Sequence, residues 1–91
     1  MTKGPTKKRP SYKRTFSKNP AFYGEVGWKL RAAREACGLT QTEVAERLSV
    51  PQSQISKVER GKTAISLCLF AEWCMLTNAD ASTVLKWSMR A

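Results

Sequence analysis

Residues 39–61 constrain the fold most, because they hold the start and stop signals of two short helices joined by a tight turn. Thr40, followed three residues later by Glu43, forms a capping box, which predicts that a helix begins near Gln41. Pro51 is not tolerated in a helix interior but fits a first turn, so it separates this helix from the next. The first helix then has about two turns, and a helix so short needs neighbours to be stable.

The second helix is predicted to run from residue 51 or 52 to residue 60, with Gly61 as the left-handed residue that ends it. At about 100° per residue, Ile55 and Val58 point toward a core, with Glu59 at the edge. The opposite face carries uncharged polar and basic side chains, namely Gln52, Ser53, Ser56, Lys57 and Arg60. Such side chains hydrogen-bond to base edges and phosphates, so this face suits a DNA groove, although an isolated helix with this pattern is more often an ordinary solvated surface.

Residues 29–80 resemble the Cro and phage-repressor type of helix-turn-helix protein, the Xre family. The matching positions are Leu30, Arg34, the runs 38–41 and 44–48, Val50 and the run 52–62. Ser49 departs from the pattern, since the family usually has glycine at this turn, and serine at positive φ costs about 1 kcal/mol. The resemblance implies an all-α fold, a five-helix lambda-repressor-like DNA-binding domain whose helices two and three form the helix-turn-helix at residues 41–60.

The resemblance also implies a role for each polar residue of the motif. Helix three would be the recognition helix, with its first polar residues and Lys57 at base edges and the others at the flanks. Gln41 would donate to a phosphate from the positive start of helix two, and the residues just after helix three would hold a neighbouring phosphate. The implied DNA contacts are Gln41, Gln52, Ser53, Ser56, Lys57, Arg60, Lys62 and Thr63.

The helix before the motif is expected to start at about residue 20 and is best defined between residues 26 and 37, although Gly24 and Gly27 weaken its opening turns. Its core stripe is Val26, Leu30, Ala33 and Cys37, and Gly38 closes it. The resemblance implies an internal ion pair between Arg34 of this helix and Glu59. A structural role suits that pair best, because breaking a buried pair costs about 3 to 5 kcal/mol.

The positive charge is concentrated in residues 1–20. The whole chain has a net charge of +9, of which this segment contributes seven bases and no acid. Prolines and few apolar residues predict a disordered basic arm, whose natural partner is a polyanion. The arm residues expected to contact DNA in a neighbouring groove are Lys7, Lys8, Arg9, Lys13 and Arg14. The alternative is that the arm is only a solubilising tail.

Two apolar helices are predicted to complete the domain of residues 21–91, at 65–76 and at 80–89. Glu72 is the only charge in the first of them, and Asp80 is a good N-cap for the second. So small a domain is not expected to hide all of their large side chains, which predicts a symmetric homodimer through Phe70, Trp73, Leu85 and Trp87. For each of these residues taken singly, packing within one chain is the alternative.

Several classes of function are disfavoured. The chain has 91 residues and no stretch of 18 apolar residues, and its basic N-terminus lacks the apolar run of a secretion signal, so a cytoplasmic, nucleoid-associated protein is expected. Without histidine, Cys37, Cys68 and Cys74 suggest neither a zinc site nor disulfides, and they are interpreted as small buried hydrophobes. No residue set suggests catalysis, a cofactor or a small-molecule ligand.

These observations predict a sequence-specific double-stranded DNA-binding transcriptional regulator of a prokaryote or phage. It is expected to repress by occupying an inverted-repeat operator as a homodimer, with half-sites about 34 Å apart. Three alternatives stay open. An antitoxin-type regulator would bind another protein through its apolar C-terminal helices, a restriction-modification controller protein has a similar size and motif, and an architectural binder would depend mainly on the arm.

Overall fold

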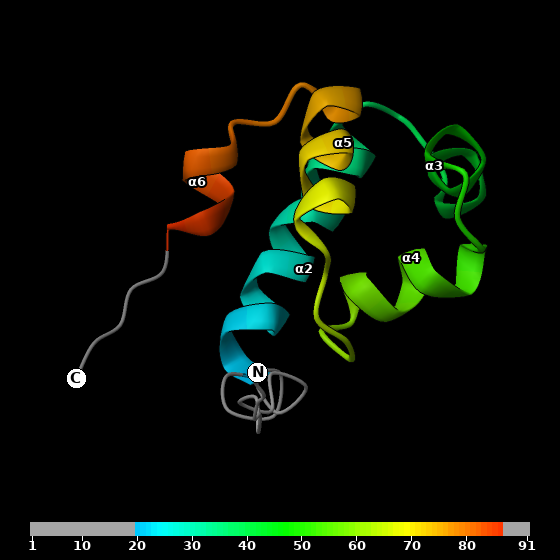
Figure 1. The fold of residues 1–91 in the computed structure, drawn as a ribbon. Helices are drawn as coiled ribbons and strands as arrows, with labels where there is room; N and C mark the ends of the chain where they lie inside the picture. The colour runs from blue at the N-terminus through cyan, green and yellow to red at the C-terminus, as the bar shows by residue number, and fades with distance from the viewer. Residues whose placement is uncertain (1–19, 87–91) are drawn as a thin grey trace, which may run out of the picture.

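The computed structural model describes residues 20–86, and every regular element in that range is a helix. The elements are α2 (Pro20–Ala36), α3 (Gln41–Leu48), α4 (Gln52–Glu59), α5 (Leu67–Thr77) and α6 (Ala81–Leu85) (Figure 1). The all-helical class and the helix count predicted from the sequence are therefore confirmed. Within the described range, no helix combines the length and the apolar character needed to cross a membrane.

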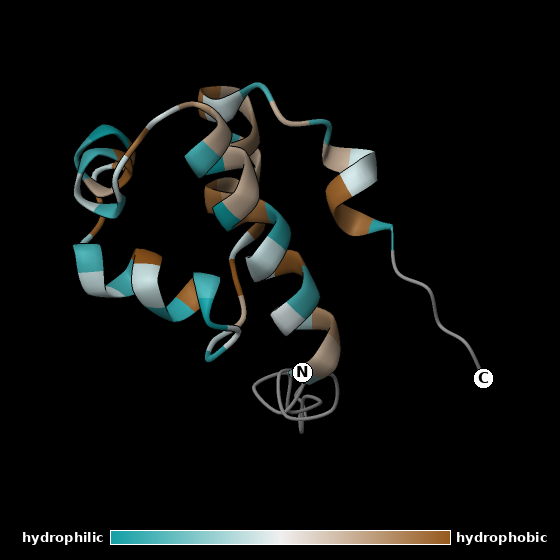
Figure 2. Cartoon of the chain, turned by 180° about the vertical axis from the view of Figure 1, so that it is seen from behind, coloured by the Kyte–Doolittle hydropathy of each residue, from teal (hydrophilic) through white to brown (hydrophobic). Residues whose placement is uncertain are grey.

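All five described helices contribute to the core, and α6 does so through Val84, which is 5% exposed. Leu30 of α2, Val44 of α3, Ile55 of α4 and Trp73 of α5 are its largest fully buried side chains. Because α3 and α4 have only eight residues each, this shared core supplies the stability that neither helix has alone. Figure 2 shows hydrophobic and hydrophilic residues alternating along α4, as expected for a helix with one buried side and one exposed side.

The ends of α3 and α4 are set by the signals that the sequence contains. The Thr40 hydroxyl accepts a hydrogen bond from the Glu43 amide at 3.0 Å, and the Glu43 carboxylate accepts one from the Thr40 amide at 2.8 Å. Ser49 ends α3 in the left-handed conformation with φ 59°, and Gly61 follows α4 with φ 69°. Pro51 is the residue just before α4, and its backbone is extended. A proline fits there because its ring fixes φ and because the start of a helix needs no amide hydrogen from it.

The buried face of α2 differs from the predicted stripe. Val26 and Leu30 are buried, but Ala33 is only partly buried and Cys37 is exposed. The helix ends at Ala36, so Cys37 lies outside it and is exposed. Arg34 is buried in place of the last stripe residue, because its side chain is paired inside the protein.

Two of the residues predicted to form a dimer interface on the apolar C-terminal helices need correction. Phe70 and Trp73 do not lie on an outer surface, since they are 6% and 0% exposed in the core of the single chain. The packing of α5 against both α2 and α3 gives them enough cover, so neither side chain is available at a dimer interface. Leu85 remains 46% exposed, and Trp87 lies outside the described residues.

The last helix is also shorter than predicted, since α6 ends at Leu85 rather than near residue 89. Lys86 is extended, and its carbonyl accepts a hydrogen bond from Lys29 Nζ at 2.7 Å. Lys29 Nζ also contacts the Thr83 carbonyl at 3.3 Å and pairs with Glu25 at 3.1 Å. A side chain of α2 thus binds the carbonyls at the end of α6, where a cation is favoured.

The three cysteines do not share one environment, contrary to the prediction that all are buried. Cys74 is buried in α5, and this burial raises the pKa of its thiol. Cys37 and Cys68 are exposed. Cys68 lies in the first turn of α5, whereas Cys37 follows the end of α2 and its thiol donates to the Thr77 carbonyl at 3.3 Å.

Candidate nucleic-acid interface

The outer face of α4 is the most polar surface that the core presents. Ile55 and Val58 anchor the helix in the core, and α4 packs against both α2 and α3. The opposite face has four exposed side chains and one partly buried one, namely Gln52, Ser53, Lys57, Arg60 and, partly buried, Ser56. The helix is therefore held on one side and presents these polar side chains on the other, as a helix that enters the major groove of DNA would.

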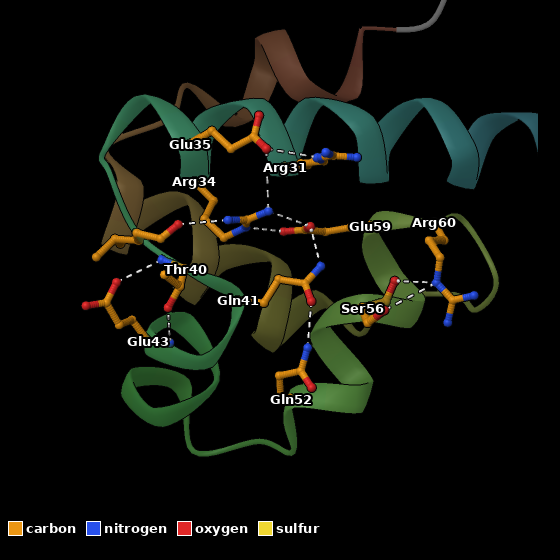
Figure 3. Close-up of polar contacts among 11 residues, drawn as sticks. Arg31, Arg34, Glu35, Thr40, Gln41, Glu43, Gln52, Ser56, Glu59 and Arg60 are labelled. Carbon is orange, nitrogen blue, oxygen red and sulfur yellow. Dashed lines mark hydrogen bonds and ion pairs between the residues drawn. The ribbon is translucent and has the colours of Figure 1, made fainter.

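Arg34 and Glu59 form the buried ion pair that the family resemblance implies. Arg34 Nε lies 2.6 Å from Glu59 Oε2, and Arg34 Nη2 lies 3.0 Å from Glu59 Oε1 (Figure 3). The hydrogen bond to Glu59 raises the pKa of the Arg34 guanidinium above its ordinary value. Arg34 Nη1 also donates to the Leu39 carbonyl at 2.8 Å. The pair thus joins α2, the loop before α3 and the end of α4.

Two glutamines extend this pair to the start of α4. Gln41 Nε2 donates to Glu59 Oε1 at 2.9 Å, and Gln41 Oε1 accepts from Gln52 Nε2 at 2.6 Å (Figure 3). We call the four residues Arg34, Glu59, Gln41 and Gln52 the polar relay. It runs from a buried charge to an exposed side chain in the first turn of α4.

The polar relay limits which atoms of Gln41 are available to a ligand. Both atoms of its terminal amide are bonded within the protein, which leaves one Nε2 hydrogen for another acceptor. Gln52, in contrast, spends a single hydrogen in the relay and keeps one donor hydrogen and its Oε1 acceptor. A donor beside an acceptor is the pattern that pairs with the N6 and N7 edge of adenine.

Two close backbone approaches fix α4 against α2. A Cβ atom on Gly27 would collide with the Val58 carbonyl oxygen of α4, and one on Gly61 would lie 2.6 Å from the Gly24 Cα atom. In the sequence these α2 glycines look like weak points of a helix. Only the crossing of two helices shows that Gly27 is needed for α4 to come so close, and no sequence pattern signals that contact.

The segment after α4 holds the remaining predicted contacts. Arg60 Nε lies 3.3 Å from both the carbonyl and the hydroxyl oxygen of Ser56, which folds the side chain back along α4. Lys62 is exposed, and the Thr63 hydroxyl, on a partly buried residue, donates to the Ala64 carbonyl at 3.4 Å. The predicted arm contacts, Lys7, Lys8, Arg9, Lys13 and Arg14, lie outside the described residues.

The described residues contain no group of three or more histidine, cysteine or acidic side chains arranged to hold a metal ion.

The comparisons with known proteins agree with this geometry. Residues 30–67 match the helix-turn-helix family model, a segment that begins in α2 and ends at the first residue of α5. No curated protein matched the chain. The matched segment includes all four residues of the polar relay and the whole exposed face of α4. The chain therefore carries a helix-turn-helix domain of the Cro and phage-repressor type, the Xre family, which supports a DNA-binding transcriptional regulator.

Proposed function

We propose that this protein is a sequence-specific repressor that occupies an inverted-repeat operator as a homodimer. The observation that carries the proposal is the position of Gln52, which is exposed at the start of α4 and held from below by the polar relay. A side chain whose orientation is set before binding loses less conformational entropy when it meets a base. Such preorganisation favours reading of sequence over general attraction to DNA.

Each residue of the α4 face has a role in this proposal. Gln52 pairs with adenine through its remaining donor and acceptor, and Lys57 donates to guanine one turn farther along the helix. Ser53 contacts either base, and Ser56 and Arg60 bind at the flanks. Gln41 donates its last Nε2 hydrogen to one phosphate, and Lys62 and Thr63 bind a neighbouring phosphate.

The basic arm adds affinity and steers the protein toward DNA, while α4 selects the sequence. Charged contacts to phosphates supply binding energy without reading bases. A regulator that acts in this way is expected in the cytoplasm, at the nucleoid.

The test is selection of bound sequences from random duplexes at physiological salt, using the full chain. We expect an enriched inverted repeat whose half-sites lie about 34 Å apart. Gln52→Ala should lose the preference at one base pair per half-site, by about 10-fold or more, and leave the other positions unchanged. Gln54→Ala is the matched control, because it removes the same side chain from a partly buried position of the same helix. Tight binding without any enriched sequence would contradict the proposal.

One observation favours a second candidate, a regulator that binds another protein. Leu67 and Met75 of α5 are 83% and 80% exposed, which is unusual for large apolar side chains. An absence of DNA binding in the selection would shift the assignment to this candidate.

A further inference from the structure

The outward side of α5 is an apolar surface with almost no charge. Leu67 and Met75 project from it, Ala71 and Cys68 are exposed between them, and Glu72 is the only charged residue of the helix. Beside this side of α5 lies a hollow of about 550 Å³ between α5 and α6. The residues that line it include Leu67, Phe70, Cys74, Met75, Ala81 and Leu85. We call this hollow and the exposed residues of α5 the α5 face.

The α5 face is self-complementary. Leu67, Ala71 and Met75 are spaced by four residues each, so they form one row along the helix, with a small residue between two large ones. A two-fold axis through Ala71 brings each Leu67 next to the other chain's Met75. The small central side chain lets two such helices approach closely, as at other crossings of small residues.

We propose that a second copy of this chain packs on the α5 face, with the two α5 helices antiparallel and crossing at Ala71. This inference rests on the homodimer of the proposed function and names its contact surface. In this dimer the contact residues on α5 are Leu67, Ala71 and Met75. The sequence predicts Phe70 and Trp73, but the core of one chain buries both.

A second copy suits this surface for two physical reasons. The row contains no charge, so two identical surfaces meet without the repulsion that two basic arms would create. The exposed polar residues of α4 lie on a different helix, and α5 packs against α2 and α3, so both faces can be occupied at once.

The size of the face predicts how strong the contact is. A helix of 11 residues is about 16 Å long, and paired helices lie about 8 to 10 Å apart. A contact of that extent falls at the small end of specific interfaces, below about 1,200 Å² in total. The free dimer is therefore weak, and two half-sites on one DNA molecule strengthen it by holding the copies together.

The geometry allows a covalent test. Cα atoms lie about 2.3 Å from a helix axis, so axes about 9 to 10 Å apart place the two Ala71 Cα atoms about 4.4 to 5.4 Å apart at the crossing. Disulfides span Cα distances of about 4.4 to 6.8 Å, so cysteine at this position should crosslink two copies. We would make Ala71→Cys in the full chain carrying Cys37→Ser and Cys68→Ser, leaving the buried Cys74. Oxidation with copper phenanthroline and a non-reducing gel measure the yield.

We expect most of the Ala71→Cys protein to become a covalent dimer, and adding Met75→Glu to reduce the yield at least 10-fold. Ala36→Cys is the control, since Ala36 is an exposed alanine at the end of α2 that does not line the hollow of the α5 face. Circular dichroism checks that each variant is folded. Crosslinking of Ala36→Cys equal to that of Ala71→Cys would overturn the proposal, because the yield would then reflect random collision.

A folded Ala71→Cys protein that stays monomeric would also overturn it, and would leave the hollow to residues 87–91 of the same chain or to a foreign protein. Failure of this inference is distinguishable from failure of the proposed function. An inverted repeat selected without this crosslink means that the dimer uses another surface, whereas a crosslink without any selected sequence means that the repressor assignment fails.

Discussion

Ser49 has a backbone conformation in which glycine is the favoured residue. Its φ of 59° places it in the left-handed region, in the turn between α3 and α4. Ser49→Gly removes the contact between Cβ and the backbone that makes this region unfavourable, so the free energy of unfolding should rise by about 1 kcal/mol. In a domain of this size, that corresponds to an increase in Tm of about 4 to 8 °C. Thermal unfolding followed by circular dichroism measures the change.

Gly38→Ala is the matched control for Ser49→Gly, because Gly38 also has a positive φ, of 73°, and no atom lies near the Cβ it would gain. That variant should lower Tm by a similar amount. An unchanged or lower Tm for Ser49→Gly would show that its left-handed conformation is not strained.

Glu59 is the residue on which the polar relay depends. Its side chain is 2% exposed and accepts hydrogen bonds from both Arg34 and Gln41. Glu59→Gln leaves the Arg34 charge buried without its counter-charge, so unfolding should become easier by about 3 kcal/mol. Urea unfolding measures the loss. The control is Glu72→Gln, which removes an exposed carboxylate and should change stability by less than about 0.5 kcal/mol. Equal effects of the two substitutions would contradict a structural role for the pair.

At the scale of elements, the crossing of α2 and α4 depends on one glycine. Gly27→Ala improves helix propensity, but its new methyl group collides with the Val58 carbonyl oxygen, so the net result should be a loss of about 1 to 3 kcal/mol. Gly24→Ala lies one turn earlier and meets no atom within 4 Å, so it should instead stabilise the protein by about 0.5 to 1 kcal/mol. Chemical denaturation of both variants tests the opposite signs. A stabilising Gly27→Ala would show that the helices do not cross this closely.

The sequence predicts best those helix ends that are set by residues close to them in the chain. Thr40, Glu43, Pro51 and Gly61 act through their nearest neighbours, so their patterns suffice to place α3 and α4. The end of α6 depends instead on Lys29, more than 50 residues away in the chain. A local pattern contains no information about such a contact.

The candidate nucleic-acid interface likewise has some features that the sequence predicts and others that only the structure shows. The polar face of α4 follows from helical spacing, and the family resemblance supplies the Arg34–Glu59 pair. The hydrogen bonds of Gln41 to Glu59 and Gln52 join residues from separate helices and required the structure. Burial was the least predictable property, because whether Phe70 or Trp73 is covered depends on how α2, α3 and α5 assemble.

At the scale of the whole molecule, most of the net positive charge lies in the first 20 residues. Seven bases lie in residues 1–20, whereas residues 21–91 contain nine bases and seven acids. If half of the arm charges bind phosphates, deleting residues 2–18 should make the plot of log K against log salt shallower by about 3. The selected sequence should stay the same. Binding titrations at several salt concentrations measure the slope, and an unchanged slope would mean that the arm does not contact DNA.

The polar relay also has a consequence for how the binding specificity of this protein evolves. A change at residue 52 must remain compatible with Gln41, which is itself tied to Glu59 and Arg34, so new base preferences at that position require coordinated substitutions. Ser53 and Lys57 are exposed and make none of the relay's bonds. Single substitutions there alter the exposed face of α4 without disturbing the interior. Among related proteins, residue 52 should therefore vary together with residue 41, while residues 53 and 57 diverge independently as operators change.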